Sequence, residues 1–220
     1  MKFFDRIKLG WQEISEGTSG EQALLKQSKA ARFHEIEQAV IVLSAAVLRP
    51  GGNFSSVHEE LLVAFLNHHF GQRHTSKRTE AFRDHYKMGP QPFVKMACEA
   101  IKSLAANEAR QEILFLLVDL AAAEQFIGES QIRLIKKISG YLQTEEQQWR
   151  EVQHRMKQWS PFAMLEMEET TSLAAIKGAY RKMVLKYHPD KSKQHEREAA
   201  RHFRDIQRAY ETLLAQIGSR

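Results

Sequence analysis

Apolar residues recur at helical spacing along most of this chain, and glycine and proline interrupt the pattern only in short clusters. The clearest breaks are Arg49–Asn53 and Gly89–Pro92, each of which contains both residue types. Because neither residue continues a helix well, such clusters mark helix ends. The sequence therefore predicts an all-α protein, and its 220 residues leave room for two modest domains.

The last quarter of the chain predicts an antiparallel pair of helices. Ser172 is a suitable N-cap for a helix over Leu173–Tyr187, and a last helix begins near Glu196. The apolar residues of the last helix alternate four and three positions apart, which is the spacing of a helix-pair seam. Ser160 before Pro161 indicates the start of another helix, and apolar residues from this segment would fill the open end of the helix pair. The seam residues are Ala199, Phe203, Ile206, Tyr210, Leu213 and Ile217, the facing residues are Ile176, Ala179, Tyr180, Met183 and Tyr187, and the plugging residues are Phe162, Leu165 and Met167.

The half of the first helix that points away from this seam is basic. It carries Lys177, Arg181, Lys182 and Lys186, and the helix contains no acidic residue. We therefore expect a patch of one charge sign rather than a salt-bridged surface. Leu185 projects from the same half, where an apolar side chain has no core to fill.

A stiff turn follows this helix at His188-Pro189-Asp190. Proline fixes its own φ and disfavours the α region for the residue before it, so the helix must end here. The turn presents an imidazole and a carboxylate, and Lys191 continues it as a polar loop.

Taken in order, these elements resemble the J domain of the DnaJ family. The tripeptide alone would be weak evidence, whereas the tripeptide between a basic helix and an aromatic-spaced helix is a strong match. The resemblance implies a domain over residues 160–220 that docks on a DnaK-type (heat-shock protein 70) chaperone and stimulates ATP hydrolysis by that partner. The matching segments are Pro161–Leu165, Ile176–Lys182, Lys186–Lys191 and Phe203–Leu213.

The resemblance also implies roles for single residues. The tripeptide occupies the positions that family members need for stimulation, and Asp190 would pair with an arginine of the partner. The basic residues would meet an acidic surface, with Leu185 as an apolar contact inside the patch. The full set expected to bind the partner is His188, Pro189, Asp190, Lys177, Arg181, Lys182, Lys186, Leu185 and Lys191.

Residues 30–157 predict a separate bundle of helices. A helical pattern runs from near Glu21 through Val47, and a second long helix covers Glu108–Ala123. The N-caps expected for three further helices are Ser56, Ser130 and Thr144, with Glu59 and Gln147 as capping-box partners of the first and the last.

This bundle shows a weak internal repeat. The run Val40–Leu43 resembles Ile113–Leu116, and Leu62 matches Ile135 at the same offset of 73 positions. A constant offset is what a duplicated unit would show, and chance similarity between amphipathic helices is the competing explanation. Two helical hairpins packed on each other would bury both apolar faces.

A helical module before a C-terminal J domain resembles DjlA-type proteins, whose middle region is TerB-like. The likeness is one of pattern only. We expect this protein to lack the transmembrane segment of DjlA. We also expect it to lack the Gly/Phe-rich linker and cysteine zinc region of full DnaJ proteins, and the fourth helix of many J domains. TerB-like domains often display acids in inter-helix turns, but only Glu124 and Glu129 stand near those turns here, so we expect no metal site.

The histidines of the module and the single cysteine predict no cofactor. The histidines lack ligand spacing with carboxylates or thiols, so we expect polar surface residues rather than a metal cluster or a pH sensor. Cys98 excludes an internal disulfide and is expected to be buried. The histidines between residues 58 and 85 are His58, His68, His69, His74 and His85.

Residues 1–29 are expected to form a lead-in helix and a flexible segment. An amphipathic helix over residues 1–11 would allow weak contact with a membrane surface, although docking on its own domain or a frayed end is the favoured alternative. Early charges rule out a signal-peptide core, and no apolar run is long enough to span a bilayer. We therefore expect a cytoplasmic protein.

These observations favour a non-enzymatic co-chaperone whose module at residues 30–157 directs DnaK-type activity to a client or a location. The alternative is a regulatory stress-response protein that acts mainly through the TerB-like module. Nucleic-acid binding is disfavoured, because the net charge of +5 is mild and the basic patch lacks an aromatic stacking platform. An enzyme is disfavoured because the sequence has no nucleotide loop, nucleophile elbow or Cys/His pair with an orienting partner.

Overall fold

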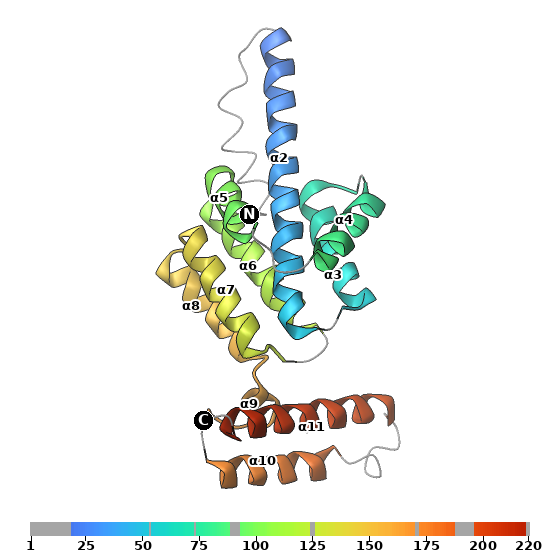
Figure 1. The fold of residues 1–220 in the computed structure, drawn as a ribbon, viewed down its shortest axis with the longest axis vertical. Helices are drawn as coiled ribbons and strands as arrows, with labels where there is room; N and C mark the ends of the chain where they lie inside the picture. Colours follow the sequence, from blue (N-terminus) through green and yellow to red (C-terminus); the bar gives the residue numbers. More distant parts are fainter. Residues whose placement is uncertain are drawn as a thin grey trace. The chain divides into compact units, whose positions relative to one another are not determined.

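The computed structural model describes residues 19–52, 54–72, 74–88, 93–123, 126–169, 172–187 and 196–218. These residues fold into α-helices and one 3₁₀ turn, with no strand in the described ranges, which confirms the all-α prediction (Figure 1). The chain divides into two compact units. The N-terminal unit comprises Met1–Ala123 and Gly128–Gln153, and the C-terminal unit comprises Glu124–Ile127 and His154–Arg220.

The N-terminal unit is built around one long helix, α2 (Ser19–Leu48), which runs through its middle (Figure 1). Residues 39–48 of this helix are buried all round, because helices pack against it on more than one side. The 3₁₀ turn η1 (Arg49–Gly51) ends α2 at the predicted Pro/Gly break. The helices packed around α2 are α3 (Ser56–Phe70), α4 (Thr75–Lys87), α5 (Val94–Leu104), α6 (Asn107–Ala122) and α7 (Glu129–Leu142), and α8 (Glu146–Lys157) follows them.

The two apolar runs of the internal similarity both lie in the core of this unit. Val40 and Ile41 of α2 and Leu114 of α6 are fully buried, and the two helices pack against each other. Burial of both runs accounts for their similar composition, and the duplication stays a prediction.

Three predicted N-caps are wrong by one or two residues. Ser55, not Ser56, caps α3, and its backbone N–H donates to Nδ1 of His58 at 3.1 Å. The imidazole thus takes the place expected for Glu59, whose carboxylate instead accepts from Arg83 of α4. Gly128, not Ser130, caps α7.

The start of α8, at Glu146, also differs from the predicted cap at Thr144. The hydroxyl of Thr144 donates to the carbonyl of Ser139 at 3.2 Å and so closes the end of α7. The backbone N–H of Glu145 donates to Oε1 of Gln148 at 3.4 Å, rather than Thr144 forming a box with Gln147. The residue types that can cap a helix are visible in the sequence. Which of them becomes the N-cap depends on how the preceding loop enters the helix.

The sequence did not predict α4 and α5 as separate helices. In α4 the buried residues are Arg78 and Phe82, so this helix has almost no apolar stripe to detect. In α5 the buried residues include Cys98, which confirms the predicted burial of the thiol. Burial also raises the pKa of the Cys98 thiol to about 12, with the charge of Glu99 adding to the effect.

The expectation of surface histidines is wrong for His58 and His69, whose exposed fractions are 3% and 8%. His58 is buried because it completes the α3 cap. His69 packs its ring against Phe65, with centroids 4.2 Å apart. Burial, together with the smaller effect of the neighbouring charge of His68, lowers the pKa of His69 to about 4.

The C-terminal unit contains the predicted helix pair. It consists of α9 (Pro161–Met164), α10 (Leu173–Lys186) and α11 (Glu196–Gly218), with α11 packed on both others. Ser160 and Ser172 cap α9 and α10 as predicted, and their hydroxyls accept from Ala163 N–H at 3.1 Å and Ala175 N–H at 3.3 Å. The buried core is Leu165, Ile176, Met183, Ile206, Ala209 and Leu213.

One core contact of this unit comes from outside the helix pair. Phe126 packs against the core, and the N–H of Ile127 donates to the carbonyl of Trp159 at 2.9 Å. The sequence placed Phe126 and Ile127 in a turn of the helical module. Nothing in the composition of this segment shows that it packs against the core of the C-terminal unit.

Candidate functional site

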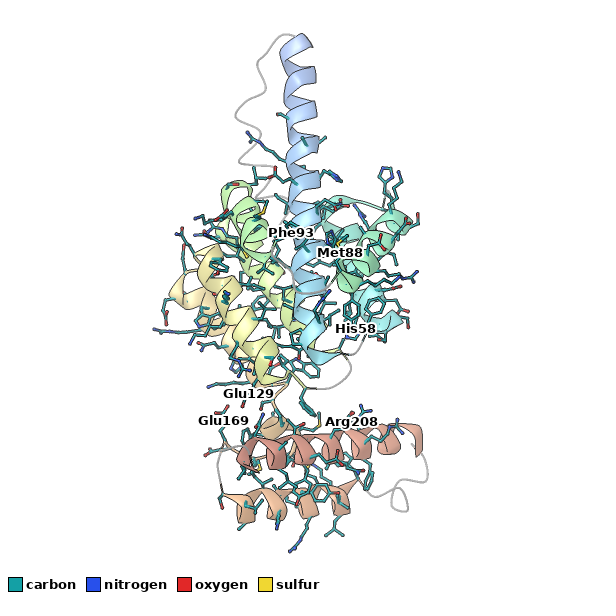
Figure 2. The ribbon with its side chains drawn as sticks, viewed as in Figure 1. His58, Met88, Phe93, Glu129, Glu169 and Arg208 are labelled. Carbon is teal, nitrogen blue, oxygen red and sulfur yellow. The ribbon has the colours of Figure 1, made fainter. Side chains whose placement is uncertain are left out.

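The basic residues of α10 lie on its exposed side. Lys177, Arg181, Lys182 and Lys186 are all exposed, and Leu185 leaves 62% of its surface accessible among them. In Figure 2, side chains fill the space between α10 and α11, and others project from α10 on the side away from α11. The helix therefore separates a buried face from a basic one, as its sequence predicted.

Stacked aromatic rings hold this basic helix against α11. Tyr180 and Tyr210 lie with ring centroids 4.1 Å apart and planes inclined by 15°. The buried side chains of Ile176 and Met183 lie one turn before and one turn after Tyr180. The basic side chains thus project from a rigid platform, so little backbone ordering remains to be done when a partner binds.

The expectation of a patch without salt bridges is wrong at Lys186. Its Nζ lies 2.5 Å from Oε1 of Glu166, which belongs to the turn after α9. The hydrogen bond from Lys186, followed by the charges of Lys186 and Lys182, lowers the pKa of the Glu166 carboxyl. The same hydrogen bond raises the pKa of Lys186. The composition of α10 alone could not reveal this pair, because the acid comes from 20 positions earlier.

The end of α10 is held on two sides. The N–H of Tyr187 donates to the carbonyl of Met183 at 3.0 Å, and the Tyr187 ring tilts against His202 of α11 with centroids 5.1 Å apart. Nζ of Lys186 lies 5.3 Å from the centroid of the same ring. The chain therefore leaves α10 from a fixed point at Tyr187.

The remaining predicted site residues lie outside the described residues. These are His188, Pro189, Asp190 and Lys191, which directly follow the fixed end of α10. Their roles stay predictions, and the described site is the basic face of α10 with the Glu166 pair.

The described ranges contain neither a metal cluster nor a membrane-spanning helix. No group of three or more metal-ligating side chains occurs within them. Glu129, one of the two acids near the turns of the N-terminal unit, pairs instead with Arg133 at 3.0 Å. No helix in these ranges is long and apolar enough to cross a bilayer.

Comparison with protein families decides what the C-terminal unit is. The model of the DnaJ domain matches residues 160–216, a segment that includes α9, α10, the tripeptide and most of α11. Residues 160–216 form a J domain. No solved structure matches the chain.

Three curated relatives each match a segment of 52 residues of this chain. The DnaJ homolog subfamily B member 3 of Homo sapiens is 44% identical over 52 residues, which is 24% of this chain and 36% of the relative. The mouse protein of the same name is also 44% identical over 52 residues, covering 24% of this chain and 22% of the relative. The chaperone protein DnaJ of Campylobacter lari is 46% identical over 52 residues, covering 24% of this chain and 14% of the relative. The chain thus spans at most about a third of these relatives, and the likeness concerns the J domain.

Proposed function

We propose that this protein is a co-chaperone that docks on a DnaK-type (heat-shock protein 70) chaperone and stimulates its ATP hydrolysis. The observation that carries the proposal is the J domain at residues 160–216, which includes His188-Pro189-Asp190. The exposed basic face of α10 supports it, because that face ends at Lys186, two positions before His188 of the tripeptide.

Docking on an acidic surface of the partner would begin with the basic face. Lys177, Arg181 and Lys182 stand on the exposed side of one rigid helix and steer a partner of opposite charge into contact. Leu185 then contributes an apolar contact within this charged surface, where it loses exposed area on binding.

The tripeptide supplies the signal for hydrolysis in this proposal. Asp190 pairs with an arginine of the partner in a charge-assisted contact, and Pro189 restricts the turn that presents it. Tyr187, held by His202 on α11, fixes where the turn begins. The J domain itself carries out no chemistry, and the bonds of ATP are broken in the partner.

The N-terminal unit directs this activity to a client or a location. Its compactness, separate from the C-terminal unit, supports an independent binding role. Its kinship with TerB-like domains rests on the arrangement of helices in the sequence.

Single-turnover ATP hydrolysis by a DnaK-type chaperone tests the proposal. The parent protein should accelerate hydrolysis, and the Asp190→Asn variant should not, since its side chain keeps its size but loses the charge that pairs with arginine. Glu169→Gln is the matched control, because Glu169 is an exposed acid of the same unit outside the helix pair, and it should stimulate like the parent. A folded parent that leaves the hydrolysis rate unchanged with more than one such chaperone would refute the proposal.

A further inference from the structure

The turn after α9 places an acidic residue in a conformation that favours glycine. Glu166 has φ of 51°, in the left-handed region, and is one of three non-glycine residues with positive φ in the described ranges. The N–H of Glu166 donates to the carbonyl of Ala163 at 3.0 Å, and the N–H of Met167 donates to that of Phe162 at 3.1 Å. This hydrogen-bond pattern closes a helix through one left-handed residue, most often glycine because a side chain is strained there.

The side chain at this position reaches the basic face of α10. The Glu166 carboxylate lies 2.5 Å from Nζ of Lys186, and both side chains are about half exposed. The positive charge of Lys182, on the same face, also favours the ionised carboxylate. One acid therefore acts on two of the four basic residues of α10, at the end nearest the tripeptide.

We propose that Glu166 is an internal counter-ion that sets how strongly the basic face binds its partner. The inference rests on the proposed function and identifies a residue that controls how strongly the docking surface binds. Lys186 must exchange Glu166 for an acid of the partner, and the carboxylate that is released repels that acidic surface. Glu166 therefore lowers the affinity of docking and leaves the hydrolysis step to Asp190. It is a positioning residue, because it acts through Lys186.

Three substitutions separate the charge of Glu166 from its backbone conformation. Glu166→Gln removes the charge and keeps a strained side chain, Glu166→Gly removes both, and Glu166→Asp keeps the charge. If charge controls docking, the first two variants need a lower concentration for half-maximal stimulation of the chaperone, by about two- to fivefold. The maximal stimulated rate stays unchanged. The half-maximal concentration for Glu166→Asp stays close to that of the parent. Of the three variants, only Glu166→Gly raises the thermal midpoint of unfolding.

Salt and a second substitution sharpen the test. The difference between the parent and Glu166→Gln should shrink at about 0.5 M salt, where exposed charges are screened within a few ångströms. In a Lys186→Met background, Glu166→Gln should change the half-maximal concentration less than it does in the parent, because the direct partner is gone.

The outcomes separate this inference from the proposed function. Stimulation by the parent with the same half-maximal concentration for Glu166→Gln overturns the role of Glu166 alone. A change in Glu166→Gly that Glu166→Gln does not share overturns it too, because backbone strain would then be the cause. Absence of any stimulation by the parent overturns the proposed function and the inference with it.

Discussion

Glu37 of α2 and Arg78 of α4, 41 positions apart, form a two-bonded ion pair inside the N-terminal unit. Nε of Arg78 donates to Oε1 of Glu37 at 2.9 Å, and Nη2 donates to Oε2 at 3.0 Å. The exposed fractions of the two side chains are 4% for Arg78 and 13% for Glu37. Nη1 of Arg78 also donates to Oδ1 of Asn67 at 2.8 Å and to the carbonyl of Gly71 at 2.6 Å. Arg78 thus ties the end of α3 to both α2 and α4.

Removing the acid of this pair should destabilise the N-terminal unit strongly. Glu37→Gln leaves the Arg78 guanidinium buried without its counter-charge, and we expect a loss of about 3–5 kcal/mol in the free energy of unfolding. Urea unfolding followed by circular dichroism measures it. The control is Glu59→Gln, because the partner of Glu59 is the largely exposed Arg83, and its stability should change little. Equal midpoints for Glu37→Gln and the parent would contradict a structural role for the pair.

The tyrosine stack should contribute to the stability of the J domain through ring contact. Tyr180→Ala removes the ring that lies 4.1 Å from Tyr210, and we expect a loss of about 2 kcal/mol from lost burial and stacking. Tyr180→Phe retains the ring and should behave like the parent. Near-ultraviolet circular dichroism during urea unfolding reports the change. A large loss in Tyr180→Phe would assign the effect to the hydroxyl instead.

The buried His69 predicts that the N-terminal unit loses stability in mild acid. The folded pKa of about 4 lies below the ordinary value of 6.5, so between these pH values the unfolded chain binds a proton that the folded chain does not. This contribution to stability is therefore fully present above pH 6.5 and declines as the pH falls toward 4. Urea midpoints at pH 7 and pH 5 measure the decline.

Two variants test whether His69 causes this loss of stability in acid. His69→Leu keeps an apolar side chain of similar size and cannot titrate, so its urea midpoint should fall less between the two pH values. His154→Gln alters an exposed histidine of α8 and should show the full decline of the parent. The same decline in His69→Leu would place the sensitive group elsewhere.

The Cys98 thiol should be unreactive in the folded protein. It is fully buried, and its pKa of about 12 leaves almost no thiolate at neutral pH. Labelling by a chromogenic disulfide reagent should accelerate at least about 100-fold on unfolding in guanidinium chloride, where the thiol becomes exposed with an ordinary pKa. Complete labelling in native buffer within the mixing time would show that α5 opens readily.

Features set by neighbours in the sequence were predicted well. The all-α class, the break at Pro50, and the caps at Ser160 and Ser172 all depend on residues within one or two helical turns. The opposed faces of α10 follow from the same periodicity, as do the core contacts of Ile206, Tyr210, Leu213 and Ile217 in α11, whereas the buried Ala209 was not predicted. The tripeptide was found in the same way, since its residues are contiguous.

Features that depend on distant partners were missed or placed wrongly. The helix α4 buries a charged Arg78, which no apolar pattern signals and which is tolerated only because Glu37 lies opposite. The burial of His69 depends on the packing around α3, and the docking of Phe126 depends on the C-terminal core. Each required the folded arrangement of residues far apart in the chain.

The sequence by itself therefore determined the helical class, the J domain and the basic residues that α10 presents. The tertiary structure decided the charge that this face carries, because the left-handed turn at Glu166 brings a carboxylate onto Lys186 from another element. Periodicity assigns a residue to a face of its own helix, whereas electrostatic pairing depends on distances across the fold.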